Sequence, residues 1–542
     1  MLTVRTLLRS AIRRDRVTLA IWILGTALLA LFAASAVGGT YGDEAERTGI
    51  LRLAVDNPAI LLLRGLPHGT SLPAFVFFQI FTWLALLAGL MSSFLAVRHT
   101  RAEEESGRAE FIAATPAART APTVAALVHG VLADLVLGAA VAAALVAGGM
   151  PGPGSVASGC AVAAVGVAFL TVGLLAAQFA RTSRGANTLG VGAVCAAFLL
   201  RGLGDALGTP EAGGAAMASS WPSWLSPIGW GQHVFAFTDD DLRPLLLCLA
   251  LAVACSAAVL VLQARRDSGA SLLPARVGRA AARPWLRSSF ALGWRLHWPT
   301  LVAWCAGGAA FGLFAGGLSG VVVQAAETDP DLAANLRTIV PSGGSVTQVL
   351  IAAMFALVGV IAAGSATQAV IRLRQEEAHG TAELMLSTRL GRVRWLGGYL
   401  ALGALSIALV LASGAAASAG AVFAGVLAGT DEPRHAADSL AAAAAQLPAA
   451  LVYLAVLALL FVLLPGATAA LGWALLGAGV FLGVFGGLLG IPQWARDLSP
   501  FTHTPVAAGA GTDLGGAGWM VLLAAAAASA ALVLMRRREL RG

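Results

Sequence analysis

The chain consists of long apolar runs separated by short polar or Gly/Pro-rich breaks. A run of about 20 apolar residues crosses the ~30 Å hydrocarbon core of a membrane as an α-helix, whereas the strands of a membrane barrel are shorter and alternate in polarity. The pattern therefore predicts an all-α integral membrane protein with twelve transmembrane helices in two sets of six. The predicted spans are 17–37, 73–97, 122–148, 155–179, 188–207 and 243–263, then 299–322, 346–371, 395–425, 446–464, 469–490 and 517–535.

Composition agrees with this prediction and narrows the function classes. Of the 542 residues, 58% are hydrophobic and only 12% are charged, and the mean hydropathy of +0.81 is far above that of a soluble globular protein. The five cysteines lie in or beside predicted spans, with no CxxC and no histidine at ligand spacing, so we expect reduced packing residues and no metal site. Without paired carboxylates or a nucleophile motif, an enzyme is not expected.

The charges predict the orientation in the membrane. All 35 basic residues are Arg, of which 27 lie in predicted loops on the side that holds both termini and 8 on the other side. By the positive-inside rule, both termini are expected in the cytoplasm. The net charge of +7 then reflects orientation, and we expect no nucleic-acid partner because no basic cluster is interleaved with aromatic residues.

The Arg-rich N-terminus imitates a cleavable signal peptide, but we expect it to be retained. A similar sequence precedes and begins the seventh predicted span. At a constant offset of 282, Arg13, Thr18 and Trp22 match Arg295, Thr300 and Trp304. Residues 1–16 carry apolar side chains on one helical face and Arg largely on the other, which predicts a helix in the inner membrane interface. Ordinary positive flanking of the first span is the alternative.

An internal duplication is visible in the polar segments. RAEEESGRAEFIAATPAAR begins at Arg101, and RQEEAHGTAELMLSTRLGR begins at Arg374, without a gap in their alignment. The same offset of 273 carries the Leu-Ser-Pro of 225–227 onto that of 498–500. Because six spans return the chain to its starting side, the two copies are expected to be parallel repeats related by an axis along the membrane normal.

This duplication gives the predicted domain organisation. It comprises an interfacial helix (1–16), a first six-helix repeat (17–263), a cytoplasmic linker with an interfacial helix (264–298), a second six-helix repeat (299–535) and a basic cytoplasmic tail (536–542).

Both copies of the polar segment lie between the second and third predicted helices of their repeat, on the cytoplasmic side. If each copy were one helix, Glu103, Gly107 and Glu110 would lie on one face, and so would their counterparts. An ordinary charged loop is the alternative, although such a loop needs no particular sequence. The candidate partner-binding residues are Glu103, Glu104, Gly107, Glu110, Arg119, Glu376, Glu377, Gly380, Glu383 and Arg392.

The pattern EExxGxxE followed by Thr and Arg, with Ser-Pro after the fifth helix, resembles the membrane subunit of an ATP-binding-cassette (ABC) exporter. The duplicated twelve-span chain is similar to the polyketide-antibiotic (tetronasin-type) and multidrug exporter permeases of high-GC bacteria. The resemblance implies a multi-pass protein of the bacterial cytoplasmic membrane that exports hydrophobic or amphiphilic drug-like compounds. It further implies that each polar segment is a coupling helix seated in a cytoplasmic ATPase subunit, and that Ser226-Pro227 and Ser499-Pro500 close the outer exit.

Energy must then come from another polypeptide. A phosphate-binding GxxxxGK[ST] loop requires Lys, and the sequence contains none. We therefore expect two copies of a separate ATPase subunit, one for each coupling segment, with ATP and Mg²⁺ bound in that partner and no cofactor bound by this chain.

The resemblance also places a substrate path between the halves. Candidate lining residues are Phe77, Phe78 and Phe81 in the first half and Met354 and Phe355 in the second. Packing against neighbouring helices is the alternative for these side chains. Asp134 is the one acid predicted in mid-membrane, and it supports a rival hypothesis, a proton-coupled secondary transporter, although a structural hydrogen bond would explain it equally well.

Overall fold

The computed structural model describes residues 2–539 except 57, 212–213, 266–271, 273–280, 282, 329–345, 428, 430, 484–491 and 506–514. The chain forms two compact units, Met1–Val277 and Gly278–Gly542. Within the described residues, twelve helices are long and apolar enough to cross a membrane. The prediction of an all-α protein with twelve spans is therefore confirmed.

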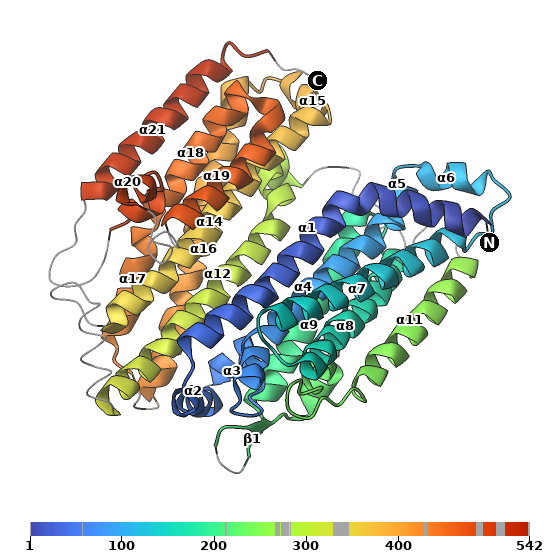
Figure 1. Cartoon of the computed structure of the whole chain (residues 1–542). Coiled ribbons are helices and arrows are strands. Elements are labelled where there is room, and N and C mark those ends of the chain that lie inside the picture. The colour runs from blue at the N-terminus through green and yellow to red at the C-terminus, as the bar shows by residue number, and fades with distance from the viewer. Residues whose placement is uncertain are drawn as a thin grey trace. The chain divides into compact units, whose positions relative to one another are not determined.

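Unit 1 is a helical bundle with a small irregular region between its last two spans (Figure 1). Its spans are α1 (Leu2–Thr40), α4 (Leu72–Arg98), α7 (Ala121–Ala147), α8 (Gly152–Phe179), α9 (Ser183–Ala206) and α11 (Leu245–Arg265). The shorter elements are α2 (Glu44–Asp56), α3 (Pro58–Arg64), α5 (Arg101–Glu105), α6 (Arg108–Ala113), β1 (Thr209–Pro210), β2 (Met217–Ala218), η1 (Trp221–Leu225) and α10 (Pro227–Gln232). The strands β1 and β2 pair antiparallel.

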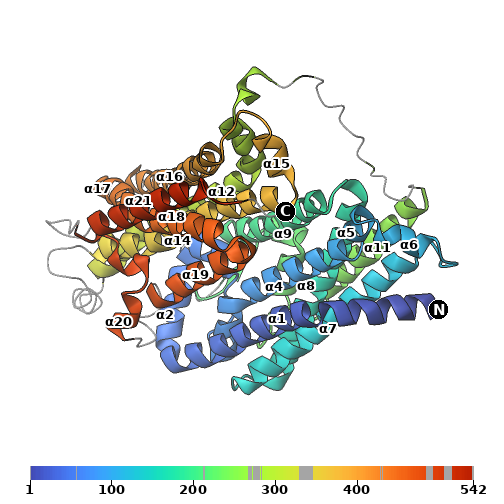
Figure 2. The same ribbon diagram turned by 90° about the horizontal axis from the view of Figure 1, so that it is seen from above.

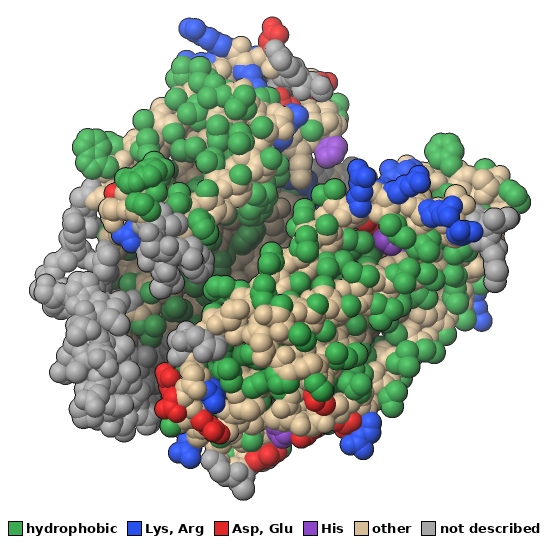
Figure 3. Space-filling view, in the orientation of Figure 1, with side chains coloured by type: hydrophobic (Ala, Val, Ile, Leu, Met, Phe, Trp, Pro, Cys, Tyr) green, Lys and Arg blue, Asp and Glu red, His purple; other side chains and the backbone are tan. Residues whose placement is uncertain are grey.

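The helices α4 and α8 form the centre of unit 1. They are the most deeply buried of its spans, and Figure 2 shows them between α1 and α7 on one side and α9 and α11 on the other. Close approach of α7 and α8 depends on two glycines, because a Cβ at Gly138 would meet the backbone of Gly159. Apolar side chains cover the flank of this unit, and charged side chains gather toward its two ends (Figure 3).

Unit 2 repeats the plan of a six-span bundle. It contains η2 (Pro284–Arg287), α12 (Ser289–Thr328), α14 (Val346–Ala378), α15 (Thr381–Leu386), α16 (Arg392–Leu427), α17 (Arg434–Ala445), α18 (Leu447–Leu463), η3 (Pro465–Ala467), α19 (Thr468–Gly483), α20 (Gln493–Arg496), η4 (Pro500–His503) and α21 (Gly515–Met535). The helix α14 and the consecutive helices α17 and α18 are the most buried of these spans.

A stripe of small residues joins α12 to α16. Gly308, Gly312 and Gly316 recur at every fourth position of α12, and each faces the backbone of α16. A Cβ at Gly312 would collide with the backbone of Gly414. Association of helices in lipid depends on close packing rather than on the hydrophobic effect, so this stripe is the structural basis of the α12–α16 contact.

The structure differs from the predicted boundaries in two places. The helix α1 is continuous from Leu2 to Thr40, so residues 1–16 extend the first span instead of forming a separate helix. The fourth span of unit 2 begins at Arg434, earlier than predicted. The predicted end of the next span, from residue 484 onward, lies outside the described residues.

Gly312→Val should weaken unit 2 by about 1–3 kcal/mol, because the added side chain has no room against the backbone of Gly414. The matched control is Gly317→Val on the same helix, since a Cβ at Gly317 has nothing within 4 Å. Thermal unfolding of the two purified variants measures the difference. Equal melting temperatures would contradict the role of the glycine stripe.

Candidate functional site

The two polar segments share one backbone conformation. In unit 1, α5 ends at Glu105, Gly107 adopts a left-handed conformation with φ of 73°, and α6 begins at Arg108. In unit 2, Gly380 has a φ of 71° between α14 and α15. A left-handed residue ends a helix, so the expectation of one continuous helix with an acidic face is wrong. Each segment is instead a helix, a left-handed glycine and a second short helix.

The second short helix of each segment exposes an apolar side chain that the sequence analysis missed. Phe111 is 78% exposed and Leu384 is 73% exposed. They occupy equivalent positions, 273 residues apart, and each follows an exposed glutamate, Glu110 or Glu383. The detectable signal was an apolar residue at the same register of both polar segments. The exposed apolar side chain is therefore a feature that both polar segments share.

The other predicted acids of the first segment bind within unit 1. Glu103 accepts hydrogen bonds from Arg14 on α1 at 2.5 Å and from Arg108 at 2.9 Å. The hydrogen bond to Glu103 and the negative charge of Glu103 raise the pKa of Arg108. Glu104 pairs with Arg101 at 2.7 Å. This network fixes the segment to α1 and ties α5 to α6.

The second segment is held differently. Glu376 is 6% exposed and accepts hydrogen bonds from the indole of Trp395 at 3.2 Å and the hydroxyl of Tyr399 at 2.5 Å. Glu377 is 3% exposed and pairs with Arg538 of the C-terminal tail at 2.6 Å. These two acids therefore fix the end of α14, from which the rest of the segment extends.

The predicted basic residues also make backbone contacts inside their own units. Arg392 donates to the carbonyl oxygen of Arg538 at 2.9 Å, and the carbonyl oxygen of Arg119 accepts a hydrogen bond from Gln263 at 3.2 Å. The exposed part of the predicted surface is thus narrower than expected. Of the predicted residues, Glu110, Arg119, Glu383 and Arg392 are exposed, and Phe111 and Leu384 are exposed beside the two glutamates.

The two Ser-Pro elements are anchored in the same way. The hydroxyl of Ser226 donates to the carbonyl oxygen of Ala197 in α9 at 2.7 Å and caps α10 through the amide of Gly229. The hydroxyl of Ser499 donates to the carbonyl oxygen of Gly479 in α19 at 2.7 Å. Both serines are buried. Pro227 and Pro500 each begin the short helix that follows, so each element is tied to the fifth span of its unit.

The candidate path residues lie in the cores of their own units. Phe77, Phe78 and Phe81 are between 2% and 7% exposed and belong to the core cluster of unit 1. Phe77 stacks on Phe81 with ring centroids 4.7 Å apart. Phe355 is fully buried in the core of unit 2, with Met354 packed against that core. The alternative, packing against neighbouring helices, describes these side chains better than an open aromatic wall.

Asp134 is fully buried in unit 1 and links three helices. Its Oδ1 accepts a hydrogen bond from the hydroxyl of Ser92 on α4 at 2.5 Å, and its carboxyl group lies against Gly166 of α8. His129 lies one and a half turns earlier on α7 and bonds to Asp15 instead. This geometry favours a structural hydrogen bond between α4 and α7 over a proton relay.

Two cavities lie beside the predicted site residues. One of about 230 Å³ lies beneath the first polar segment and is lined by Arg14, Glu103, Glu104 and Arg119, among others. The other, of about 350 Å³, adjoins Ser499 and Pro500 in unit 2.

Twelve apolar helices, with charge gathered at the ends of the bundles, define a multi-pass integral membrane protein. The family model described as the C-terminal domain of the multidrug efflux system permease Rv1217c matches residues 5–262 and 286–536. The chain therefore belongs to this family of multidrug efflux permeases of the bacterial cytoplasmic membrane. It is 34% identical over 508 residues to the multidrug efflux system permease protein Rv1217c of Mycobacterium tuberculosis, a match that covers 93% of this chain and 89% of the relative.

The left-handed glycines provide a test of segment geometry. Replacing both Gly107 and Gly380 with Ala should strain each turn by about 1 kcal/mol, because non-glycine residues disfavour positive φ. No atom lies within 4 Å of a Cβ at either position, so the effect isolates backbone conformation from packing. Hydrogen exchange of 101–113 and 374–386 should increase. Asn at both positions should restore protection, because Asn tolerates the left-handed region.

Gly192→Ala is the control, since its Cβ also has nothing within 4 Å and its φ is ordinary. Unchanged exchange in the double Ala variant would show that the turns do not need glycine.

Proposed function

We propose that this chain is the permease subunit of an ATP-driven exporter of hydrophobic or amphiphilic drug-like compounds. Two copies of a separate cytoplasmic ATPase subunit bind its two polar segments and hydrolyse ATP with Mg²⁺. The six-helix units are parallel repeats, and both termini face the cytoplasm. ATP-driven approach of the ATPase subunits rotates the units and opens a path past the Ser-Pro elements.

One observation carries this proposal. Two segments 273 residues apart each place an exposed Glu-apolar pair on the short helix that follows a left-handed glycine. Their other acids are held inside the units, so the exposed pair projects from a fixed base. Interfaces depend on a few apolar anchors surrounded by polar contacts, and the repetition implies one docking site for each of two partners.

Further support comes from the sequence and the family. The chain has no Lys and hence no GxxxxGK[ST] loop of its own. The family model matches one range in each half, which supports the duplication. The relative's name describes a permease of a multidrug efflux system, which supports drug-like compounds as substrates.

The exposed anchors give the decisive variants. Phe111→Asp and Leu384→Asp remove the apolar contacts and place a second acid beside Glu110 or Glu383. Loss of an interface anchor costs about 2 kcal/mol, so each variant should weaken ATPase binding by roughly 30-fold. We expect both variants to fold, since these side chains are exposed. The affinity is measured by titrating the purified partner ATPase subunit against the purified permease.

Leu427→Asp is the matched control, because Leu427 is 91% exposed at the end of α16 that lies farthest along the chain from α15. It should bind ATPase like the wild type. Wild-type affinity in the double variant Phe111→Asp/Leu384→Asp would refute docking at these segments. If drug efflux persists without any ATPase, the ATP-driven mechanism is wrong.

A further inference from the structure

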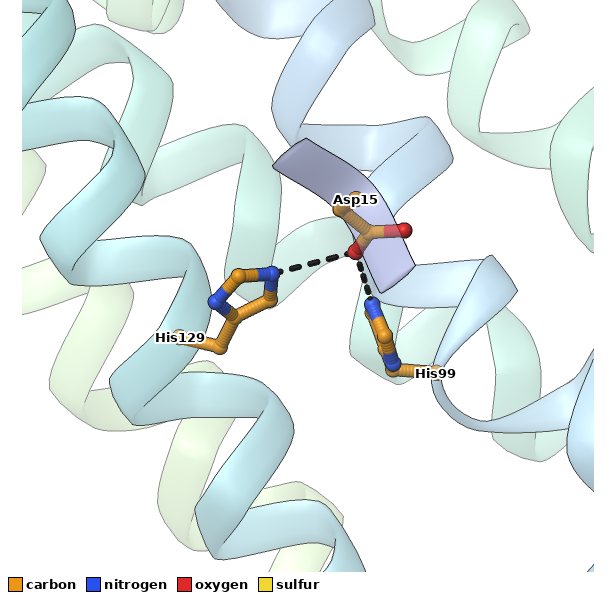
Figure 4. Close-up of side chains that lie close together, drawn as sticks. All are labelled: Asp15, His99 and His129. Atoms are coloured by element: carbon orange, nitrogen blue, oxygen red, sulfur yellow. Dashed lines mark hydrogen bonds and ion pairs between the residues drawn. The ribbon is translucent and has the colours of Figure 1, made fainter. Parts of the chain in front are cut away.

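We propose that Asp15, His99 and His129 form a binding site for one divalent transition-metal ion, of which Zn²⁺ is the type. The three side chains come from separate parts of unit 1: Asp15 from α1, His99 from the end of α4 and His129 from α7. Figure 4 shows the Asp15 carboxylate between the two imidazole rings. This inference does not rest on the proposed transport mechanism.

The donor atoms already converge on one point. Among the described residues, the donor atoms of these three side chains all lie within 4.8 Å of one another. Oδ2 of Asp15 is hydrogen-bonded to Nε2 of His99 and lies 3.1 Å from Nε2 of His129. Two ligands of one tetrahedral Zn²⁺ are about 3.3 Å apart when the bonds are near 2.0–2.1 Å. An ion could therefore replace the two hydrogen bonds after small side-chain shifts.

The chemistry of the donors selects the class of ion. Two imidazole nitrogens and one carboxylate oxygen suit Zn²⁺, Co²⁺ or Ni²⁺, whereas Mg²⁺ and Ca²⁺ prefer oxygen ligands alone. Both histidines can bind through Nε2 as Nδ1–H tautomers. The side chains of Asp15 and His129 are 1% and 2% exposed and that of His99 is 10% exposed, so little water competes for the site.

Arg98 holds the carboxylate in place for such an ion. Its Nε lies 2.8 Å from Oδ1 of Asp15, which directs Oδ2 toward the imidazoles. This contact is an ion pair, and a charged outer-shell partner on the second oxygen of the carboxylate is common in protein metal sites. The arrangement thus has both the ligands and an orienting partner.

An ion can reach the cluster from two cavities of unit 1. The cavity of about 230 Å³ is lined in part by His99, and another of about 350 Å³ is lined in part by Asp15 and Arg98. A three-residue site leaves one position of a tetrahedral ion for water, and these cavities provide room for it.

The ion would clamp α1 to the base of the first polar segment. His99 lies two residues before α5, and Arg14, next to Asp15, pairs with Glu103 of that segment at 2.5 Å. Unit 2 lacks the equivalent ligands, since the offsets of 282 and 273 place His297, Arg372 and Leu402 at these positions. The proposal therefore specifies one ion per chain and not two.

The test uses the full chain without a histidine tag. Purified protein is stripped with chelator, incubated with Zn²⁺, freed of unbound ion and measured by elemental analysis. The wild type should retain about one ion per chain, and His99→Ala and His129→Ala should fall to background. Co²⁺ should give visible d–d absorption in the wild type that both variants lack. His379→Ala and His503→Ala, which remove exposed histidines of unit 2, are the controls and should retain the ion.

Folding is checked by the melting temperature in chelator, and Asp15→His supplies a ligand-retaining variant that should still bind Zn²⁺. Zn²⁺ should raise the melting temperature of the wild type and leave that of His99→Ala unchanged. A wild type that retains no ion overturns the proposal. So does Zn²⁺ retention by the double variant His99→Ala/His129→Ala at the wild-type level.

Discussion

Hydrocarbon offers no hydrogen bonds, so every polar group that a helix carries into the membrane must find its partner within the protein. Several buried polar residues of this chain have such a partner on a neighbouring helix and thereby link helices. Asp134 joins α7 to α4 through Ser92, and Glu376 joins the end of α14 to α16 through Trp395 and Tyr399. Arg201 on α9 donates to the carbonyl oxygens of Leu61 and Leu62 in α3. The few polar side chains therefore fix the bundles more specifically than the many apolar ones.

The need for internal hydrogen-bond partners also distinguishes the acids that are bonded within their own unit from those that are exposed. Where the polar segments leave the bundle, Glu103, Glu376 and Glu377 remain bonded to their own unit. Past the left-handed glycines a second short helix begins in each segment, and it exposes one glutamate and the apolar residue beside it. Glu110 with Phe111, and Glu383 with Leu384, are thus presented on a rigid base. Both units use this arrangement although their anchoring contacts differ.

The hydropathy pattern was sufficient to predict the twelve spans, because burial in lipid requires about 20 apolar residues irrespective of tertiary contacts. It could not predict that α1 starts at Leu2, since the arginines that suggested an interfacial helix include Arg14, whose partner Glu103 is 89 residues away. The helix break at Gly107 depends on its positive φ angle, which a glycine permits but does not require. The exposure of Phe111 was not predicted, because the charged residues of the segment alone were considered as candidates for partner binding.

The Asp15 cluster shows the limit of sequence reasoning most clearly. Asp15 lies 84 residues from His99 and 114 from His129, so no local spacing predicts a metal site. Their meeting depends on how α1 packs against α4 and α7. The burial of the aromatic side chains near Phe81 in the core of unit 1 could not be predicted for a related reason, because helical periodicity shows that a face is apolar but not which neighbour covers it.

The mass of the assembled complex tests the central claim most directly. The permease is purified from membranes with its cassette ATPase, and native mass spectrometry counts the subunits of each intact particle. The account predicts one permease chain with two ATPase subunits, because one chain presents both docking segments. Particles that contain two permease chains with two ATPase subunits, or a permease without any ATPase, would contradict it.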